Sequence, residues 1–170
     1  MTKEKGTSVI ALFNMSLLLV FTIVCLGVAF STIRGFQDVQ EERDNISELA
    51  VAMSYLNARL RQNDCSYAVR IDLSPVGDGS ALVITEEIED SEYETWIYWW
   101  AGELVESFIE KGDDRIEEAS SPIAEIDGFE VTYDEPDLVK IHVWCGVGSK
   151  NKDLTFKVAL RTQPIGAEEF

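Results

Sequence analysis

The first third of the chain contains a long apolar run. The 28 residues from Gly6 to Ile33 include no charged side chain. As an α-helix this run would be about 42 Å long, which exceeds the roughly 30 Å hydrocarbon core of a bilayer. Secretory signals have shorter apolar cores, of about 7–15 residues. We therefore predict a retained transmembrane helix at 7–33 behind a cytoplasmic leader at 1–6; a signal cleaved near Gly27–Ala29 is the alternative.

A second helical pattern follows the apolar run directly. Residues 34–64 contain no proline, so nothing in the sequence ends the helix before Gln62-Asn63-Asp64. Apolar side chains at steps of three and four residues form one stripe: Ile46, Leu49, Met53, Leu56 and Leu60. This spacing is typical of an amphipathic helix with one buried face. We predict that the span continues as one helix through 34–64 and packs this stripe on the rest of the chain.

Strand patterns take over after residue 65. Tyr67, Val69 and Ile71 alternate with polar side chains, as in a half-buried strand. Strands are predicted at 66–73, 81–88, 95–100, 104–109, 129–133, 138–145 and 154–162. Residues 112–128, which include Pro122, are expected to form a long acidic connection. The sequence thus predicts an α+β fold, a long helix packed on an antiparallel meander sheet at 65–162, with a loose tail at 163–170.

Charge is distributed unevenly along the chain. Residues 34–170 contain 12 basic and 30 acidic side chains, a net charge of −18, whereas Lys3 and Lys5 precede the apolar run. Basic residues that flank a span stay in the cytoplasm. We therefore expect a single-pass protein of the cell membrane with a cytoplasmic N-terminus and an extracytoplasmic C-terminal domain. So acidic a domain repels nucleic acid, which excludes a nucleic-acid-binding role.

Two cysteines lie outside the apolar run. Cys65 and Cys145 would pair in an oxidising exterior, and closing a loop of about 80 residues contributes up to ~4.5 kcal/mol in the chain-entropy model. Two free thiols are the alternative. The sequence leaves both possibilities open.

Residues with catalytic or metal-binding chemistry are sparse. His142 is the only histidine, and the pattern of strand 138–145 puts it on the less buried face with Lys140 and Trp144. Without a second histidine or clustered cysteines, the sequence supports neither a zinc site nor a nucleophile–histidine pair, so no enzyme is expected. The one cation site considered is calcium near Asp134–Asp137; otherwise no cofactor is expected.

Aromatic residues are densest at 95–100. Strand alternation puts Trp96, Tyr98 and Trp100 on one sheet face, and Ile97 and Trp99 on the other. We expect both faces to be covered, one by the helix and one by the acidic connection. The alternative is an exposed aromatic ladder that stacks on a polysaccharide or on a partner subunit.

The layout resembles type IV pilins and the pseudopilins of type II secretion. Lys5-Gly6 stands where a prepilin peptidase would cleave, leaving Thr7 as the new N-terminus, and an apolar helix follows at once. The segments Y-L-N-A-R-L-R-Q-N-D and T-W-I-Y-W-W-A-G-E-L-V-E are similar to minor pseudopilins of the J type. The chain also resembles a group of uncharacterised short pilin-like membrane proteins. The resemblance implies a non-catalytic subunit whose partners are other pilin-like subunits and their assembly machinery.

One position departs from the pilin pattern. The family has a glutamate in the fifth place after the cleavage glycine, where this chain has Ala11. In filaments that glutamate neutralises the amine of a neighbouring subunit within hydrocarbon. Its absence suits a subunit at a filament tip, and it suits equally an anchored interaction or sensing domain that is neither processed nor polymerised.

Overall fold

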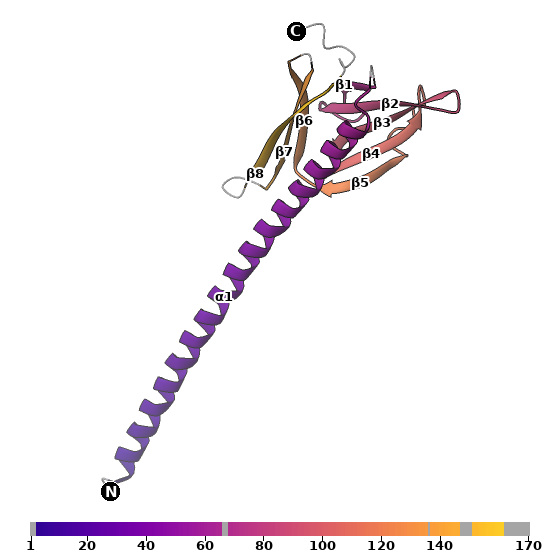
Figure 1. Cartoon of the computed structure of the whole chain (residues 1–170). Helices are drawn as coiled ribbons and strands as arrows, with labels where there is room; N and C mark the ends of the chain where they lie inside the picture. The colour runs from indigo at the N-terminus through magenta and orange to yellow at the C-terminus, as the bar shows by residue number, and fades with distance from the viewer. Residues whose placement is uncertain (1–2, 66–67, 136, 147–150, 162–170) are drawn as a thin grey trace. The chain divides into compact units, whose positions relative to one another are not determined.

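The computed structural model describes residues 3–65, 68–135, 137–146 and 151–161. Helix α1 (Lys3–Gln62) comes first, and the side chains of 3–9, 11, 37 and 38 within it are not described. Eight strands follow: β1 (Val69–Leu73), β2 (Ser80–Ile88), β3 (Ser91–Trp100), β4 (Glu103–Glu110), β5 (Ser120–Glu125), β6 (Gly128–Glu135), β7 (Leu138–Cys145) and β8 (Lys152–Ala159). The predicted α+β fold, one long helix and an antiparallel meander, is confirmed (Figure 1). The predicted tail at 163–170 lies outside the described residues.

Helix α1 begins at Lys3, just before the apolar run, and ends at Gln62, where the sequence predicts. Within the apolar run Thr22 donates its hydroxyl hydrogen bond to the carbonyl of Leu18 at 2.6 Å, so this polar group is satisfied by the helix itself. At the other end Arg59 and Arg61 occupy the last turn, where positive charge complements the helix dipole. The backbone N–H of Asn63 bonds to the carbonyl of Arg59 at 3.1 Å and closes the helix.

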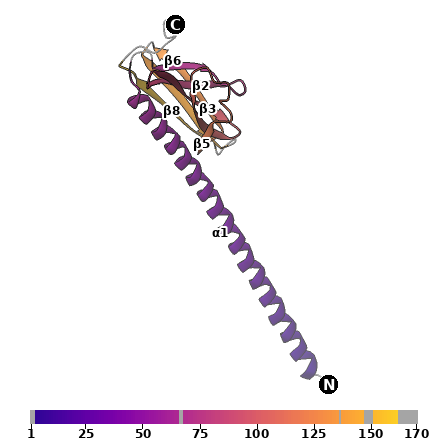
Figure 2. The ribbon, with the colours of Figure 1, turned by 90° about the vertical axis from the view of Figure 1, so that its right-hand side faces the viewer.

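Contacts divide the chain into two compact units, residues 1–42 and 43–170. The second unit contains the end of α1, from Arg43 to Gln62, and both sheets. Strands β1 to β5 form an antiparallel sheet in chain order, here called sheet A, and β6 to β8 form a second antiparallel sheet, sheet B. The sequence predicted one meander; the chain instead starts a new sheet after Glu125 (Figures 1 and 2).

Tight turns connect the central strands of sheet A. Glu89 and Asp90 between β2 and β3 have φ angles of 50° and 67°, and Ala101 and Gly102 between β3 and β4 have 53° and 91°. Two successive residues with positive φ match the twist of the flanking strands, which is why such pairs make good hairpins. The Ala101-Gly102 hairpin is where the sequence predicted one.

Strand β5 was not predicted. Residues 112–128 were expected to be a connection, but Ser120–Glu125 pairs with β4, with a register shift between Leu104 and Val105. Pro122 lacks a backbone N–H, which argues against a central strand. Because β5 is the edge of sheet A, that missing donor breaks no ladder hydrogen bond. The expectation of a loop at these residues was wrong.

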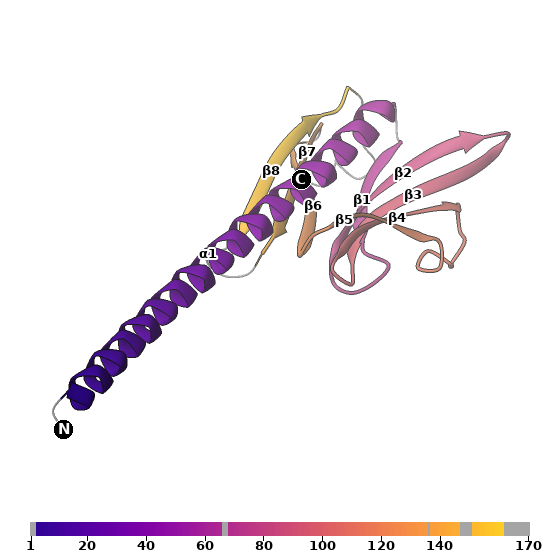
Figure 3. The same cartoon turned by 90° about the horizontal axis from the view of Figure 1, so that it is seen from below.

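The main core forms where α1 meets one face of each sheet. Strand alternation supplies Val69, Ile84 and Ile97 from sheet A and Val131, Ile141 and Val158 from sheet B. The last turns of α1 lie against both sheets, with β8 of sheet B on one side and sheet A, beginning with β1, on the other (Figure 3). Together they make a single hydrophobic cluster that defines the fold of the second unit.

The helix stripe is buried only in part as predicted. Leu49, Leu56 and Leu60 are at most 1% exposed, but Ile46 and Met53 are 50% and 37% exposed. The fully buried partner is Ala52 instead. At about 100° per residue, Ala52 and Ile46 lie on opposite sides of Leu49. The buried face of the helix is therefore rotated towards Ala52 and away from Ile46. Ile46 and Met53 are therefore removed from the predicted packing stripe.

A smaller cluster covers the other face of sheet A. Ala81, Val83, Tyr98 and Val105 are buried there, and Val76, Trp96 and Ile116 pack against them. Ile116 belongs to the acidic connection after β4. The expectation that this connection covers one face of the aromatic strand is confirmed for Tyr98, which is 0% exposed.

Candidate functional site

The apolar run of α1 exposes its side chains all round. Between Ile10 and Ile33 the large hydrophobic side chains that are described are 55–73% exposed, Ile33 and Met15 being the extremes. Water disfavours such a surface, and a bilayer accepts it. Among the described residues, one helix is long and apolar enough to cross a membrane. This feature is compatible with a single-pass membrane anchor.

The proposed processing residues lie at the start of this helix. Lys5, Gly6 and Thr7 have helical backbone, and their side chains lie outside the described part of the chain.

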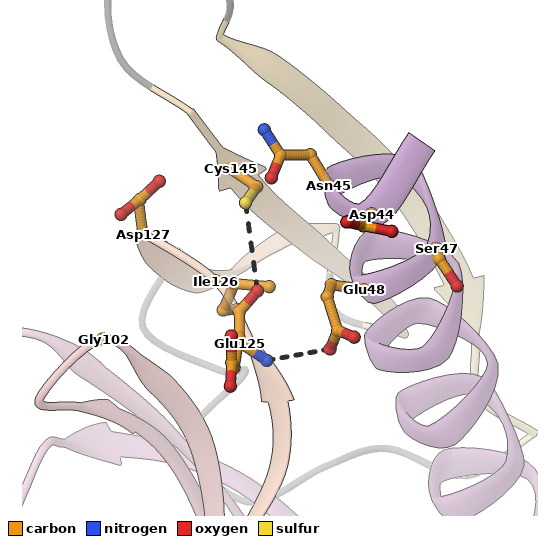
Figure 4. Close-up of a pocket in the computed structure, with 9 residues that line it drawn as sticks. All are labelled: Asp44, Asn45, Ser47, Glu48, Gly102, Glu125, Ile126, Asp127 and Cys145. Atoms are coloured by element: carbon orange, nitrogen blue, oxygen red, sulfur yellow. Dashed lines mark hydrogen bonds between the residues drawn. The ribbon is translucent and has the colours of Figure 1, made fainter. Parts of the chain in front are cut away.

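A polar pocket of 520 Å³ lies between α1, the β3–β4 turn and the junction of the two sheets (Figure 4). Glu48 accepts a hydrogen bond from the backbone N–H of Glu125 at 2.9 Å, which ties α1 to the end of β5. Asp44 and Asp127 add further carboxylates. Cys145 closes the pocket at the end of β7. These residues define the acidic pocket.

The thiol of Cys145 is held protonated. Its Sγ lies 3.9 Å from the carbonyl oxygen of Glu125 and donates to it. Burial, and then the negative charge of Asp127, raise the pKa of Cys145 above its ordinary value. A nucleophilic cysteine needs the opposite shift, because the thiolate is the reactive form. Cys145 is therefore an inert thiol of the core.

Cys65 and Cys145 are both free, so the bridge that the sequence left open is not formed. Cys145 lines a pocket with Asn45, and Cys65 follows the end of α1 at Gln62. Gln62 lies 17 positions after Asn45, which is about 25 Å along the helix, whereas a disulfide needs Cα atoms within roughly 7 Å. The geometry thus favours the alternative of two free thiols.

His142 lies where the alternation predicted, on the outer face of sheet B. Its Nε2 is 3.5 Å from a carboxylate oxygen of Asp153, and its Nδ1 is 3.9 Å from one of Glu130. Its ring is tilted against Trp144, with centroids 5.0 Å apart. The ring thus has two carboxylates and an aromatic neighbour, an arrangement that orients an imidazole but supplies no nucleophile.

The acidic turn at Asp134–Asp137, considered as a calcium site, makes contacts within the β domain instead. Asp134 forms an ion pair with Lys157 of β8, which lowers the pKa of Asp134. The backbone carbonyl of Asp137 accepts a hydrogen bond from Leu160. Within the residues that the structure describes, no group of three or more His, Cys, Asp or Glu side chains could hold a metal ion.

The aromatic strand has the predicted alternation but is covered unevenly. Tyr98 is fully buried, whereas Trp99 and Trp100 at the end of β3 are 39% and 38% exposed. Trp99 is still fixed, because its indole N–H donates to the carbonyl of Ile126 at 2.8 Å. Neither alternative from the sequence holds throughout: one end of the strand is core and the other is surface.

Two charged clusters were missed by sequence reasoning. Tyr55 and Arg59, one turn apart on α1, both bond to Glu106 of β4, with Arg59 Nη2 at 3.0 Å from its Oε2. Burial, and then the bond to Glu106, raise the pKa of Tyr55 to about 12. Their spacing of four residues was the only sequence signal, and it does not name the partner on β4.

The second cluster joins β1 to β3. Arg70 donates two hydrogen bonds to Glu94, at 2.8 and 3.2 Å, and its guanidinium lies 5.3 Å from the ring centroid of Trp96. Trp96 also donates its indole N–H to Glu94 at 3.0 Å. The guanidinium is thus enclosed by a carboxylate and an aromatic face, which compensates the burial of Glu94 at 4% exposure.

Comparison with known proteins places this second unit in a family. Neither the curated proteins nor the solved structures contain a match to the chain. A family model matches residues 47–144, from the packed part of α1 to the end of β7, and leaves the apolar run outside the match. Since this match covers more than half of the chain, the protein belongs to the family described as Domain of unknown function (DUF4860).

Proposed function

We propose that the protein is a non-catalytic, pilin-like subunit of a type IV pilus or a type II-like secretion assembly. The observation that carries the proposal is the single helix α1, Lys3–Gln62. Its first part exposes apolar side chains and its last part packs in the core of a β domain. One element thus joins a membrane-embedded segment to a folded domain, as a pilin-like design requires.

The mechanism is one of packing rather than chemistry. An assembly machine would extract the subunit from the bilayer, and helices from neighbouring subunits would pack along residues 9–30. Once the helices have left the lipid, packing them together removes their apolar side chains from water. This burial contributes about 25 cal/mol for each Å² of apolar surface. The acidic β domain, which carries most of the net charge of −17, stays hydrated outside the bundle.

Within the pilin-like proposal, Ala11 suits a position at the filament tip. A buried carboxylate at this place would serve to neutralise the amine of an adjacent subunit. A tip subunit has no neighbour above it that needs such a partner. The proposal therefore includes a tip or initiating role, with the N-terminus in the cytoplasm before assembly and the β domain outside.

Processing after Gly6 tests the proposal. We would express the full chain with and without a prepilin peptidase and measure the intact mass. Expected is the loss of residues 1–6, so that the mature protein begins at Thr7. Gly6→Leu should block this loss, because a peptidase pocket built for glycine has no room for a side chain. Gly27→Leu is the matched control: a Cβ at Gly27 meets nothing within 4 Å, and processing should persist.

The second candidate function is an anchored interaction or sensing domain that is never processed. Ala11 in place of an acidic residue suits this candidate equally well. An unchanged mass with an active peptidase, and a Gly6→Leu protein indistinguishable from the wild type, would support this candidate and contradict the pilin-like one.

A further inference from the structure

A second pocket lies within the β domain, where the β1–β2 turn meets the ends of β3 and β7. Its volume is 350 Å³. Three of the four tryptophans of the chain line it, namely Trp99, Trp100 and Trp144. Gly77 and Gly79 of the turn leave its rim open. We call it the tryptophan pocket; all of its lining residues fall within the DUF4860 match.

Two of the three indole rings are fixed by their surroundings. Trp99 is held by its hydrogen bond to the carbonyl of Ile126. Trp144 lies across Gly128, its cross-strand partner, so closely that a Cβ on Gly128 would stand 1.9 Å from Cζ2 of the ring. The pocket is therefore preorganised, and a ligand would not have to order these side chains on binding.

The charged side chains that line the pocket are carboxylates, which accept hydrogen bonds and donate none. They are the exposed carboxylates of Asp78 and Asp127, and no lysine or arginine is among the lining residues that the structure describes. Asp127 also borders the acidic pocket, with Glu48 and Glu125 beyond it. Indole faces attract cations as well. Asp127 accepts a hydrogen bond from the backbone N–H of Gly146 at 2.6 Å, and a carboxylate can accept more than one. Lysine and arginine side chains only donate hydrogen bonds, so a cationic side chain suits both the carboxylates and the indole faces.

The same chemistry already operates elsewhere in the β domain. Arg70 lies over Trp96 and pairs with Glu94, so there the chain supplies its own guanidinium. In the tryptophan pocket the aromatic rings and the carboxylates are present, with no basic side chain among the described lining residues. An arginine fits better than a lysine, since its planar guanidinium stacks on aromatic rings and is more weakly hydrated.

We propose that the tryptophan pocket binds an arginine side chain from a basic segment of a partner protein. Further basic residues of that segment would lie along the acidic pocket, towards Glu48 and Glu125. The overall charge of −17 attracts such a partner from a distance and speeds its encounter. This inference concerns the β domain alone and holds whether or not the chain is processed.

The experiment follows the indole signals of the full chain in detergent micelles by NMR. The probe is the peptide acetyl-Gly-Arg-Gly-Arg-Gly-amide, and its control replaces both arginines by citrulline, which has nearly the same shape without charge. The arginine peptide should shift the indole N–H signals of Trp99, Trp100 and Trp144. Trp96, whose face Arg70 already occupies, is the internal control and should not shift. The citrulline peptide should shift none of them.

Two exposed aspartates provide charge-matched variants. Asp78→Asn in the pocket should weaken binding of the arginine peptide by about threefold to tenfold, whereas Asp90→Asn in the β2–β3 turn should leave it unchanged. Trp100→Leu should weaken binding by about threefold to thirtyfold. If the Trp100→Leu protein does not fold, the comparison of Asp78→Asn with Asp90→Asn still tests whether the peptide binds in the pocket.

Three outcomes would overturn the proposal. Equal weakening by Asp78→Asn and Asp90→Asn would mean that only the general acidic field binds the peptide. Shifts caused by a disaccharide such as cellobiose, with none from the arginine peptide, would mean a sugar site. Unchanged binding of the arginine peptide by a folded Trp100→Leu protein would mean that the indole faces are not part of the site.

Discussion

At the scale of single residues, a few polar groups govern how α1 is held on sheet A. The phenol of Tyr55 donates to Glu106, and Arg59 Nε donates to the same phenol oxygen at 2.8 Å. Two side chains from one helix turn thereby satisfy a carboxylate on the sheet. Because Glu106 is only partly exposed, removal of either donor leaves its charge less well compensated.

Alkaline pH should weaken this contact through Tyr55. Its pKa is about 12 in the folded protein against an ordinary value of 10.0, so the folded state retains the phenol proton more tightly. The contribution to stability is fully present below pH 10 and is lost as pH rises towards 12. Urea midpoints at pH 8, 10 and 11 should therefore fall more for the wild type than for Tyr55→Phe. Parallel curves for the two proteins would show that the phenol proton plays no part.

Gly128 is the second decisive residue, because its missing side chain makes room for Trp144. A Cβ there would overlap the indole ring, so Gly128→Ala must displace the ring and should cost about 1–3 kcal/mol. Gly79→Ala is the control, since its Cβ would meet only Ser74 at an ordinary 3.7 Å. Chemical unfolding measures both. Equal stabilities of the two variants would contradict the close packing of Trp144 on Gly128.

At the scale of elements, periodicity revealed the helix and most strands but not how they pack. The apolar run and the stripe are long patterns, so α1 was predictable over its length. Strand β5 was missed because Pro122 and its polar neighbours resemble a loop, and only the pairing with β4 makes them an edge strand. The contact between Tyr55 and Glu106 joins residues 51 positions apart, a separation at which a single sequence carries no signal.

The helix stripe illustrates the same limit and permits a direct test. Leu56 is 0% exposed in the shared core, so Leu56→Ala should lower the free energy of unfolding by about 2–5 kcal/mol. Ile46 is 50% exposed, and Ile46→Ala should cost well under about 1 kcal/mol, as surface changes do. Thermal unfolding of the two variants in micelles gives the comparison. A large loss of stability in Ile46→Ala would mean that Ile46 is buried after all, as the sequence predicted.

At the scale of the whole molecule, the three cysteines lie in three different environments and report on topology. Cys25 belongs to the apolar run of α1, Cys65 is exposed after the end of α1, and Cys145 is buried. A maleimide that cannot cross membranes reaches a thiol only if that thiol is outside the cell and exposed. The proposed orientation therefore makes Cys65 the one residue that it labels in intact cells.

Labelling after mild reduction with an impermeant phosphine should thus give one adduct per chain, and Cys65→Ser should abolish it. Denaturation should add Cys145, because unfolding exposes the core, while Cys25 should react only after the bilayer is dissolved. Labelling of Cys65 only in lysed cells would reverse the orientation and, with it, the extracytoplasmic role of the β domain. Simultaneous labelling of Cys65 and Cys145 in intact cells would instead mean that the end of β7 opens in the native protein, so that the acidic pocket and the tryptophan pocket beside it are not rigid.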